Sequence, residues 1–343
     1  MNPERIEGIS PAVAASAQAL ARRFRSASPF PYLIIDDFLS PDLCRGLLKE
    51  FPPYDRKRFS NIYGHPSKAV YERPRELGKS FAAFDAMVSS RTFMNWLGRV
   101  SGIKNLLYDP LYTGAGAQEN LAGMHLFPHV DFNRHLTKPW RRRVNLMLYL
   151  NEGWKAAWGG CLQLFRADRG KTPAAKTIAP VFNRCAIFAA SEKSWHGVTP
   201  VTPPAREREA LSRKSVSVYF YTRETPESSA AHLTLWRFPG LPDGLEAGRR
   251  LRQTDIEAVN RALFYRDSEI DDLSMRGFHM EWKSPLPPHW RPGYRLSPEE
   301  AAWLKRQIRR QDARLGELWY GRSPVGLKEA VEKRRYDPPP LRG

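Results

Sequence analysis

The chain has 343 residues and a formal net charge of +18 at pH 7, from 54 Lys and Arg against 36 Asp and Glu. This length allows one large domain or two smaller ones with a sizeable core. The basic balance favours anionic partners, but the sequence has no zinc-finger spacing, RNP motif or dense basic tail, so a generally basic surface explains the charge better than a nucleic-acid-binding module does.

Cysteine usage and hydropathy indicate the compartment. Cys44, Cys161 and Cys185 are widely spaced and form no disulfide framework, and the last two lie in apolar strand patterns that predict buried thiols. No stretch approaches the roughly 18 apolar residues that a membrane-spanning helix needs, and no long apolar signal segment begins the chain. We therefore expect a soluble, cytoplasmic protein without a membrane partner.

The N-terminal part of the chain predicts helices and one strand. Residues 9–26 are rich in Ala and other good helix formers. After the strand Y-L-I-I-D, Ser40 is placed as the N-cap and Pro41 as the first residue of a second helix. Residues 80–100 predict a further helix whose aromatic face packs on a sheet.

Residues 52–79 are rich in charged, Pro and aromatic residues, and we interpret them as one long loop. A loop of this length in a compact domain is often functional. Two alternatives stay open, a lid over an active site and a plain surface connection. His65, within this stretch, is more typical of a solvated loop histidine than of a catalytic one.

The segments P-H-V-D-F-N and S-W-H-G-V contain candidate metal ligands. Residues two apart on a strand face the same side, so His129 and Asp131 can point at one object. A second imidazole, His196, comes from a later run with apolar flanks. Two neutral imidazoles and one carboxylate, with other positions open, are the ligand set of non-heme Fe(II) oxygenases. We interpret His125 and His135, which flank the first motif, as bystanders.

Residues 143–151 alternate in the manner of a strand. One face is entirely aliphatic and is expected to pack on helices, and the other carries Arg143, Asn145, Met147 and Tyr149. The second face then points toward the interior, where polar groups are costly unless they bind something. A binding pocket is our interpretation, and an internal hydrogen-bond network is the alternative.

Residues 213–221 repeat this pattern. Arg213, Ser215, Ser217 and Tyr219 share one face, and the intervening side chains are apolar. An inward-facing Arg with two hydroxyl groups beside it suits a carboxylate, which the planar guanidinium binds through two hydrogen bonds.

Beyond this strand the alternation ends. Residues 227–343 mix Pro-rich loops with helical runs near 255–266 and 298–318, and Ser297 with Glu300 predicts a capping box. The segment has too many Trp residues for a disordered tail, so we expect it to pack on the core. It either shapes a substrate mouth or serves as a buttress.

Five segments resemble, in order and spacing, the prolyl 4-hydroxylase-like branch of the 2-oxoglutarate/Fe(II) dioxygenases. They are H-V-D, Y-L-N-E-G-W with G-G-C-L-Q-L, N-R-C-A-I-F, S-W-H-G-V and R-K-S-V-S-V-Y-F. The resemblance implies an α+β fold with a double-stranded β-helix (jelly-roll) core at 105–226. N-terminal helices with an edge strand at 1–104 and a mainly helical and loop extension at 227–343 would flank this core.

The resemblance also implies a ligand set. Fe(II) would be held by His129, Asp131 and His196, and Arg213 would pair with the far carboxylate of the cosubstrate 2-oxoglutarate. Further side chains are expected to line the site: Tyr149, Ser215, Ser217 and Tyr112 at the cosubstrate, and Asn145, Met147 and Tyr219 in the substrate pocket.

The implied reaction is hydroxylation of an unactivated carbon in an amino-acid, peptide or natural-product substrate. It consumes O2, releases succinate and CO2, and has ascorbate as a candidate stimulant. A protein prolyl hydroxylase is the alternative within the class. From other classes, the alternatives are a nucleic-acid or polyanion-binding protein on an inactive barrel and a zinc hydrolase, which would lack a general base. The sequence leaves the oligomeric state open.

Overall fold

The fold is given by a computed structural model, which describes residues 6–62, 65–167, 173–225, 230–273, 286–287 and 289–321. The chain divides into two compact units. The first comprises Met1–Ser60, Pro66–Trp236 and Pro324–Gly343, and the second comprises Asn61–His65 and Arg237–Ser323.

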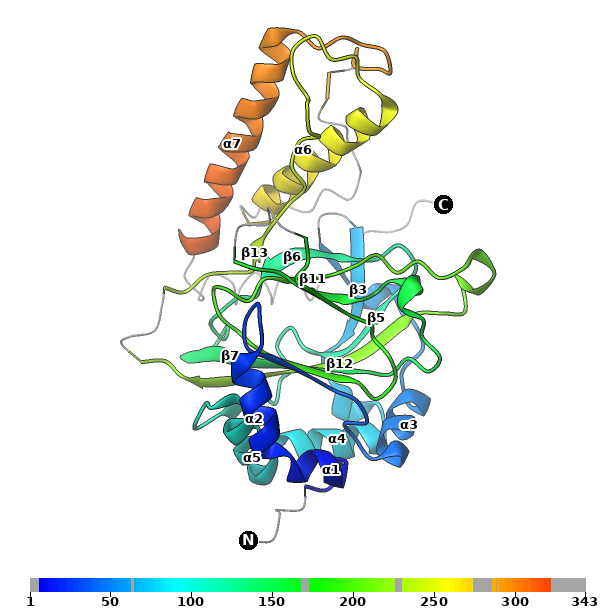
Figure 1. The fold of residues 1–343 in the computed structure, drawn as a ribbon, viewed down its shortest axis with the longest axis vertical. Coiled ribbons are helices and arrows are strands. Elements are labelled where there is room, and N and C mark those ends of the chain that lie inside the picture. The colour runs from blue at the N-terminus through cyan, green and yellow to red at the C-terminus, as the bar shows by residue number, and fades with distance from the viewer. Residues whose placement is uncertain are drawn as a thin grey trace. The chain divides into compact units, whose positions relative to one another are not determined.

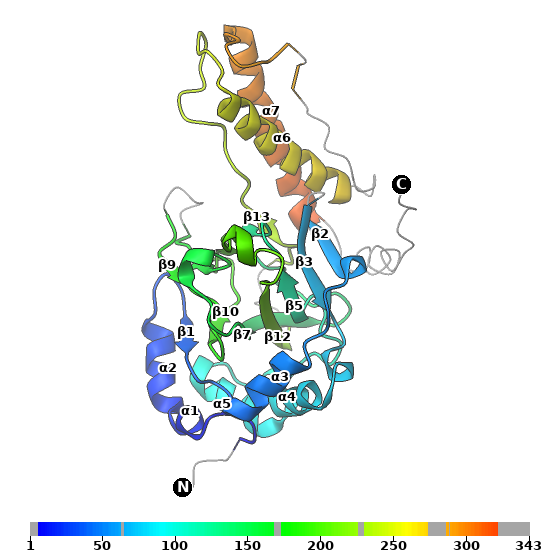
Figure 2. The ribbon, with the colours of Figure 1, turned by 90° about the vertical axis from the view of Figure 1, so that its right-hand side faces the viewer.

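Two antiparallel sheets form the core of the first unit (Figure 1, Figure 2). The larger sheet has the order β1 (Tyr32–Ile35), β10 (Cys185–Ala189), β7 (Trp140–Tyr149), β12 (Arg213–Arg223), β5 (Gly116–Asn120), β3 (His65–Tyr71) and β2 (Phe59–Ile62), with β4 (Leu107–Tyr108) paired to β12. The smaller sheet has the order β13 (Leu235–Trp236), β6 (Leu126–Val130), β11 (His196–Val198), β8 (Leu162–Leu164) and β9 (Lys176–Ile178).

The chain passes back and forth between the sheets from β5 to β12. Strands β5, β7, β10 and β12 belong to the larger sheet, and β6, β8, β9 and β11 belong to the smaller one. Eight strands shared in this order between two facing sheets are a jelly roll, or double-stranded β-helix. The predicted fold class is confirmed.

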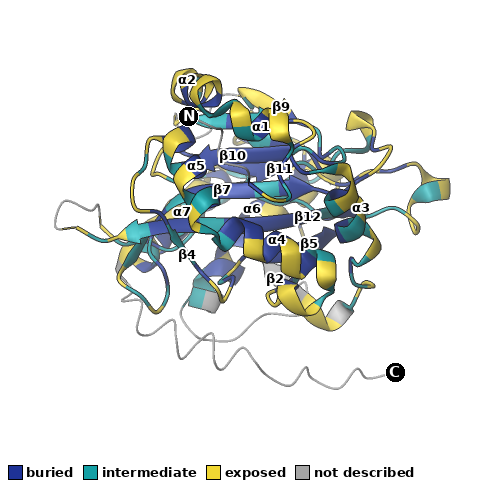
Figure 3. Cartoon of the chain, turned by 90° about the horizontal axis from the view of Figure 1, so that it is seen from below, coloured by how far each residue is buried: buried dark blue, intermediate teal, exposed yellow. Residues whose placement is uncertain are grey.

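Helices cover one face of the larger sheet (Figure 1). They are α1 (Pro11–Ala15), α2 (Ala17–Ser26), α3 (Pro41–Lys49), α4 (Lys79–Ser89) and α5 (Arg91–Ser101). The aliphatic faces of β7 and β12 form one buried cluster with helix residues such as Phe81, Phe93 and Trp96. Figure 3 shows the central strands β7, β10, β11 and β12 as buried.

Two helices predicted as continuous are each divided in two. The run 9–26 breaks at Ser16, between α1 and α2. The run 80–100 breaks at Ser90, whose extended backbone starts α5 and whose hydroxyl accepts a hydrogen bond from the Phe93 amide at 3.1 Å. A serine in this role is a helix N-cap, which competes with continuation of the preceding helix.

The interpretation of residues 52–79 as one long loop is wrong. The stretch contains β2, β3 and two short 3-10 helices, η1 (Arg56–Arg58) and η2 (Pro74–Glu76). Strand β3 pairs with β5 and extends the larger sheet, so pairing within the sheet outweighs the polar local composition. Whether any part of the stretch acts as a lid stays a hypothesis.

The second unit contains two long helices, α6 (Gln253–Leu273) and α7 (Pro298–Gly321), and a hydrophobic cluster of its own. The predicted capping box is present, because the Ser297 amide donates to Glu300 at 2.9 Å and the Glu300 amide donates to the Ser297 hydroxyl at 3.2 Å. That this extension packs on the core stays a prediction. Across the described parts of the chain, no helix combines the length and the apolar character needed to cross a bilayer.

Candidate metal centre and cosubstrate pocket

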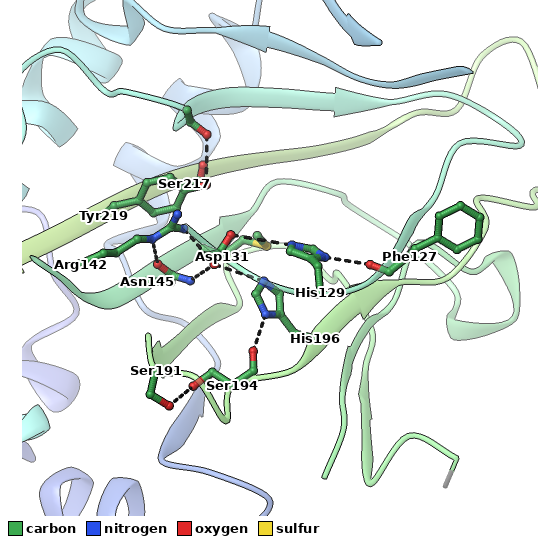
Figure 4. A network of polar contacts seen from close by, with 12 residues as sticks. Phe127, His129, Asp131, Arg142, Asn145, Ser191, Ser194, His196, Ser217 and Tyr219 are labelled. Atoms are coloured by element: carbon green, nitrogen blue, oxygen red, sulfur yellow. Dashed lines mark hydrogen bonds and ion pairs between the residues drawn. The ribbon is translucent and has the colours of Figure 1, made fainter. Parts of the chain in front are cut away.

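The structure brings His129, Asp131 and His196 together between the two sheets (Figure 4). His129 on β6 and His196 on β11 are directly opposite each other, so both rings lie on one face of the smaller sheet. Asp131 follows β6, with its carboxylate oxygens 3.7 Å from His129 Nε2 and 3.4 Å from His196 Nε2. One potential ligand atom of each residue lies within 4.8 Å of the other two.

Backbone carbonyls orient both imidazoles. His129 Nδ1 lies 2.8 Å from the Phe127 carbonyl oxygen, and His196 Nδ1 lies 2.9 Å from the Ser194 carbonyl oxygen. With Nδ1–H donating to these carbonyls, each Nε2 keeps its lone pair for a metal. Burial lowers the pKa of His129 to about 3 and also lowers the pKa of His196, so both rings are neutral at neutral pH, as ligation requires.

Two inward-facing side chains hold the carboxylate of Asp131. Asn145 Nδ2 donates to Asp131 Oδ2 at 2.8 Å, Arg142 Nη2 lies 3.0 Å from the same oxygen, and Arg142 Nε donates to Asn145 Oδ1 at 2.8 Å. Burial alone would raise the pKa of Asp131, but the charge of Arg142 holds it well below its usual value. The carboxylate is therefore ionised and fixed in orientation. This donor set fits Fe(II).

The sequence pattern did not indicate that Arg142 faces the interior, because a β-bulge interrupts the alternation of β7. Phe220 of β12 pairs with Val144, but the next residue, Tyr221, pairs with Arg142, so Arg143 is skipped. As a result Arg142 is 1% exposed, whereas Arg143 stays partly exposed. The expectation that Arg143 shares the interior face with Asn145 is corrected.

Arg213 lies 2% exposed at the start of β12 and is held in place by neutral groups. Its Nε donates to the Gly160 carbonyl at 2.8 Å, and its Nη1 donates to Asn120 Oδ1 at 2.8 Å and to the Ser215 hydroxyl at 3.4 Å. Its Nη2 lies 3.6 Å from the weak acceptor Met147 Sδ.

Tyr149 provides a second donor at the same place. The guanidinium carbon of Arg213 lies 5.1 Å from the centre of the Tyr149 ring, and the buried Tyr149 hydroxyl has no hydrogen-bond partner within the described part of the chain. A buried cation with a spare N–H and an unpartnered hydroxyl suit an incoming carboxylate. The pocket therefore fits the far carboxylate of 2-oxoglutarate.

Of the remaining predicted residues, Ser217 and Tyr219 lie near the site, whereas Tyr112 does not. Ser217 accepts a hydrogen bond from Gln118 Nε2 at 2.8 Å, and the Tyr219 hydroxyl donates to the Gly114 carbonyl at 3.0 Å while its ring covers the guanidinium of Arg142. The structure does not bring Tyr112 to this site. Its ring belongs to the cluster on the helix side of the larger sheet, and its hydroxyl donates to Asp85 of α4 at 3.0 Å.

The two flanking histidines stay apart from the ligand cluster. His125 is partly exposed and lies edge-on to Phe127, with its ring centre 4.8 Å from that of Phe127. His135 is buried, and its Nε2 lies 3.2 Å from Asp109.

Sequence reasoning missed Lys68, which lies on β3. Its neighbours Ala69 and Tyr71 belong to the helix-side cluster, and the alternation of the strand gives Lys68 the opposite face. Burial lowers the pKa of Lys68 to about 8, and the charge of Asp131 is the largest opposing influence. The alternation within K-A-V-Y could have revealed this lysine had the stretch been recognised as a strand.

Comparisons with known proteins agree with this geometry. Residues 115–221 match the family model of the 2OG-Fe(II) oxygenase superfamily. The mouse prolyl 3-hydroxylase OGFOD1 is 27% identical over 197 residues, which are 56% of this chain and 33% of that protein. The prolyl 3,4-dihydroxylase OGFOD1 of Ostreococcus tauri is 25% identical over 223 residues, 57% of this chain and 39% of that protein.

The chain thus spans well under half the length of these two relatives. Among solved structures, a prolyl hydroxylase from Trichoplax adhaerens in complex with a hypoxia inducible factor peptide fragment has a TM-score of 0.45 at 17% identity, covering 62% of this chain and 93% of that one. The matched family model and the sequence relatives support a 2OG-Fe(II) oxygenase that is similar to prolyl hydroxylases.

Proposed function

We propose that the protein hydroxylates an unactivated carbon of an amino-acid, peptide or natural-product substrate, using Fe(II), 2-oxoglutarate and O2. The observation that supports the proposal is that two groups of polar side chains line one interior. His129, Asp131 and His196, which could hold a metal, lie between the same two sheets as Arg213 and Tyr149, which could hold a carboxylate.

His129, Asp131 and His196 would hold the iron, and Arg213 with Tyr149 would hold the far carboxylate of 2-oxoglutarate. With iron and 2-oxoglutarate bound, O2 would be the oxidant: one of its oxygen atoms would convert C–H to C–OH, and the other would enter succinate as 2-oxoglutarate loses CO2. The protein contributes orientation. Asn145 and Arg142 fix the Asp131 carboxylate, and backbone carbonyls fix both imidazoles. The buried setting of the cosubstrate pocket keeps water from the anchoring charge pair.

The test is 2-oxoglutarate-dependent succinate release with Fe(II) and ascorbate, together with mass spectrometry of candidate substrates for a gain of one oxygen. We expect the wild type to release succinate and the Asp131→Ala variant to release none. Asp42→Ala, which removes an exposed carboxylate of α3, should retain wild-type turnover. Equal succinate release by the wild type and Asp131→Ala would refute the metal assignment.

A prolyl residue in a protein is the second candidate substrate, favoured by the names of the two sequence relatives. It is tested with the same assay on prolyl peptides. We also propose a cytoplasmic location, because all three cysteines are free and buried. A nucleic-acid-binding role on an inactive barrel would instead give salt-sensitive retention of DNA or RNA without turnover.

A further inference from the structure

An aromatic side chain from outside the matched family segment lies against the metal ligands. Trp236 is on β13, the short strand at the edge of the smaller sheet, and is the direct cross-strand partner of His129. The two ring centres are 4.5 Å apart, with 38° between the ring planes. Cross-strand partners share one face of a sheet, so the indole lies on the same interior face as the ligand imidazole.

Trp236 stands at one end of a row of four rings. His129 and His196 follow it across the smaller sheet, with their ring centres 4.3 Å apart, and Phe188 of the larger sheet lies 4.8 Å beyond His196. The two ends of the row differ in exposure. Phe188 is 1% exposed, whereas Trp236 is partly exposed.

The cosubstrate pocket is at the Phe188 end. Phe188 belongs to one buried cluster with Tyr149, and Met147, which touches Arg213, packs against that cluster. A cosubstrate anchored by Arg213 therefore occupies this enclosed side of the metal ligands. The partly exposed side bordered by Trp236 remains for the substrate.

Positive charge surrounds the ligands on several sides. Arg142 contacts Asp131, and Lys68 acts electrostatically on Asp131, Arg142 and Arg213. A cationic side chain would be repelled here, although an indole face by itself attracts cations.

We propose that Trp236 is a positioning residue that forms the substrate-side wall of the site, with its indole holding an uncharged, saturated side chain, aliphatic or pyrrolidine, rather than a lysyl or arginyl one. This inference rests on the proposed function. An apolar side chain on an aromatic face gains contact area and dispersion without a charge, and the stiff indole loses little entropy when it binds.

The experiment measures binding without turnover. Protein loaded with Ni(II) and 2-oxoglutarate is incubated with a synthetic peptide mixture in which one central position carries each of the twenty amino acids, and retained peptides are quantified by mass spectrometry. We expect retention of peptides with central Pro, Leu, Ile or Val over those with Lys or Arg. Trp236→Ala should lower that retention about tenfold, and Trp236→Phe should lower it only about threefold.

Affinities for Co(II) and for 2-oxoglutarate are measured in parallel, with Trp303→Phe in the second unit as the control. The proposal expects both affinities to match the wild type in every variant. Loss of Co(II) affinity in Trp236→Ala would overturn it, since the indole would then merely support His129. Equal retention by the wild type and Trp236→Ala, or no retention by either, would also overturn it. Failure of the proposed function is separate, because it would show as a wild type that binds neither Co(II) nor 2-oxoglutarate.

Discussion

The hydroxyl of Tyr149 is a buried polar group without a hydrogen-bond partner in the described structure, and such a group normally costs stability. The cost is explained if the hydroxyl is kept for a ligand. Arg213 has a similar character, because its Nη2 lies beside a thioether while its Nε and Nη1 donate to neutral oxygens. Both residues therefore have hydrogen-bond donors available for an anion.

This view predicts opposite effects of one substitution on stability and on binding. Tyr149→Phe should leave the ligand-free melting temperature unchanged or raised, since it removes an unsatisfied hydroxyl. It should weaken 2-oxoglutarate binding about tenfold, because a hydrogen bond to a charged group contributes roughly 1.5–3 kcal/mol. Calorimetric titration of 2-oxoglutarate into the Co(II)-loaded protein measures the effect.

Tyr221 supplies the matched control. Its hydroxyl is also buried without a partner in the described residues, but its ring lies beside His135 and Trp140, away from Arg213. Tyr221→Phe should have a ligand-free melting temperature that is unchanged or raised, as in Tyr149→Phe. Its affinity for 2-oxoglutarate, however, should equal that of the wild type. Equal affinity losses in both variants would mean that neither hydroxyl meets the carboxylate directly.

The buried imidazoles predict how the stability of the metal-free protein depends on pH. The pKa of His129 is about 3 in the folded protein against 6.5 for an unperturbed imidazole, so the unfolded chain binds more protons between these values. The contribution of His129 to stability is therefore complete above about pH 6.5 and is lost as the pH falls toward 3, by up to ~1.4 kcal/mol per pH unit.

Urea unfolding of the chelator-treated protein between pH 4.5 and 7 measures this slope. His129→Asn removes the titrating group and should make the free energy of unfolding less dependent on pH than in the wild type. His125→Asn, which removes a partly exposed histidine outside the ligand cluster, is the control variant. A wild-type slope retained in His129→Asn would show that other groups govern acid unfolding.

At the scale of elements, the turn before β8 shapes the cosubstrate pocket. Gly160 has a φ of +64°, its carbonyl accepts from Arg213 Nε, and a Cβ added to it would lie 2.9 Å from Arg213 Cδ. A side chain here would push the guanidinium from its place. The turn therefore needs glycine both for its backbone angle and for the close approach of Arg213.

Gly160→Ala should accordingly weaken 2-oxoglutarate binding about tenfold or more while leaving Co(II) affinity near the wild-type value. Gly153→Ala is the matched control, because Gly153 has the same φ of +64° but nothing within 4 Å of an added Cβ. Both variants should lose similar stability from backbone strain. If Gly153→Ala also lost 2-oxoglutarate affinity, general strain rather than displacement of Arg213 would be responsible.

Elements were predictable from sequence where one local pattern determined them. The capping box at Ser297 and Glu300 formed as predicted, because both partners lie within one helical turn. The bulge that turns Arg142 inward was not predictable, since it depends on pairing with β12 from far along the chain. The position of Trp236 beside the candidate metal ligands was not predictable from the sequence for the same reason. The strand β13 has only two residues, and Trp236 lies beside His129 only because β13 pairs with β6, from far earlier in the chain.

At the scale of the whole molecule, the two units have separate hydrophobic clusters. Leu251, Leu263 and Leu304 belong to the cluster of the second unit, whereas the three candidate metal ligands and Arg213 all lie in the first. Motif spacing predicted the jelly-roll fold of the first unit, because its strands carry the motifs. The second has no such motif, and only its helices and cap could be read from the sequence.

Separate cores predict that ligands act on one unit alone. A ligand that binds only the folded state stabilises it by RT ln(1 + [L]/Kd), about 2.7 kcal/mol at a hundredfold excess over Kd. Co(II) with 2-oxoglutarate should therefore raise the melting transition of the first unit and leave that of the second unchanged in calorimetry. Leu304→Ala opens a cavity beside α6 and should lower the free energy of unfolding of the second unit by roughly 2–5 kcal/mol. The melting temperature of that unit should therefore fall, while the ligand-induced shift of the first unit is preserved. A single transition that moves as a whole with either change would mean that the two units unfold cooperatively, and the second unit would then contribute directly to the stability of the metal site.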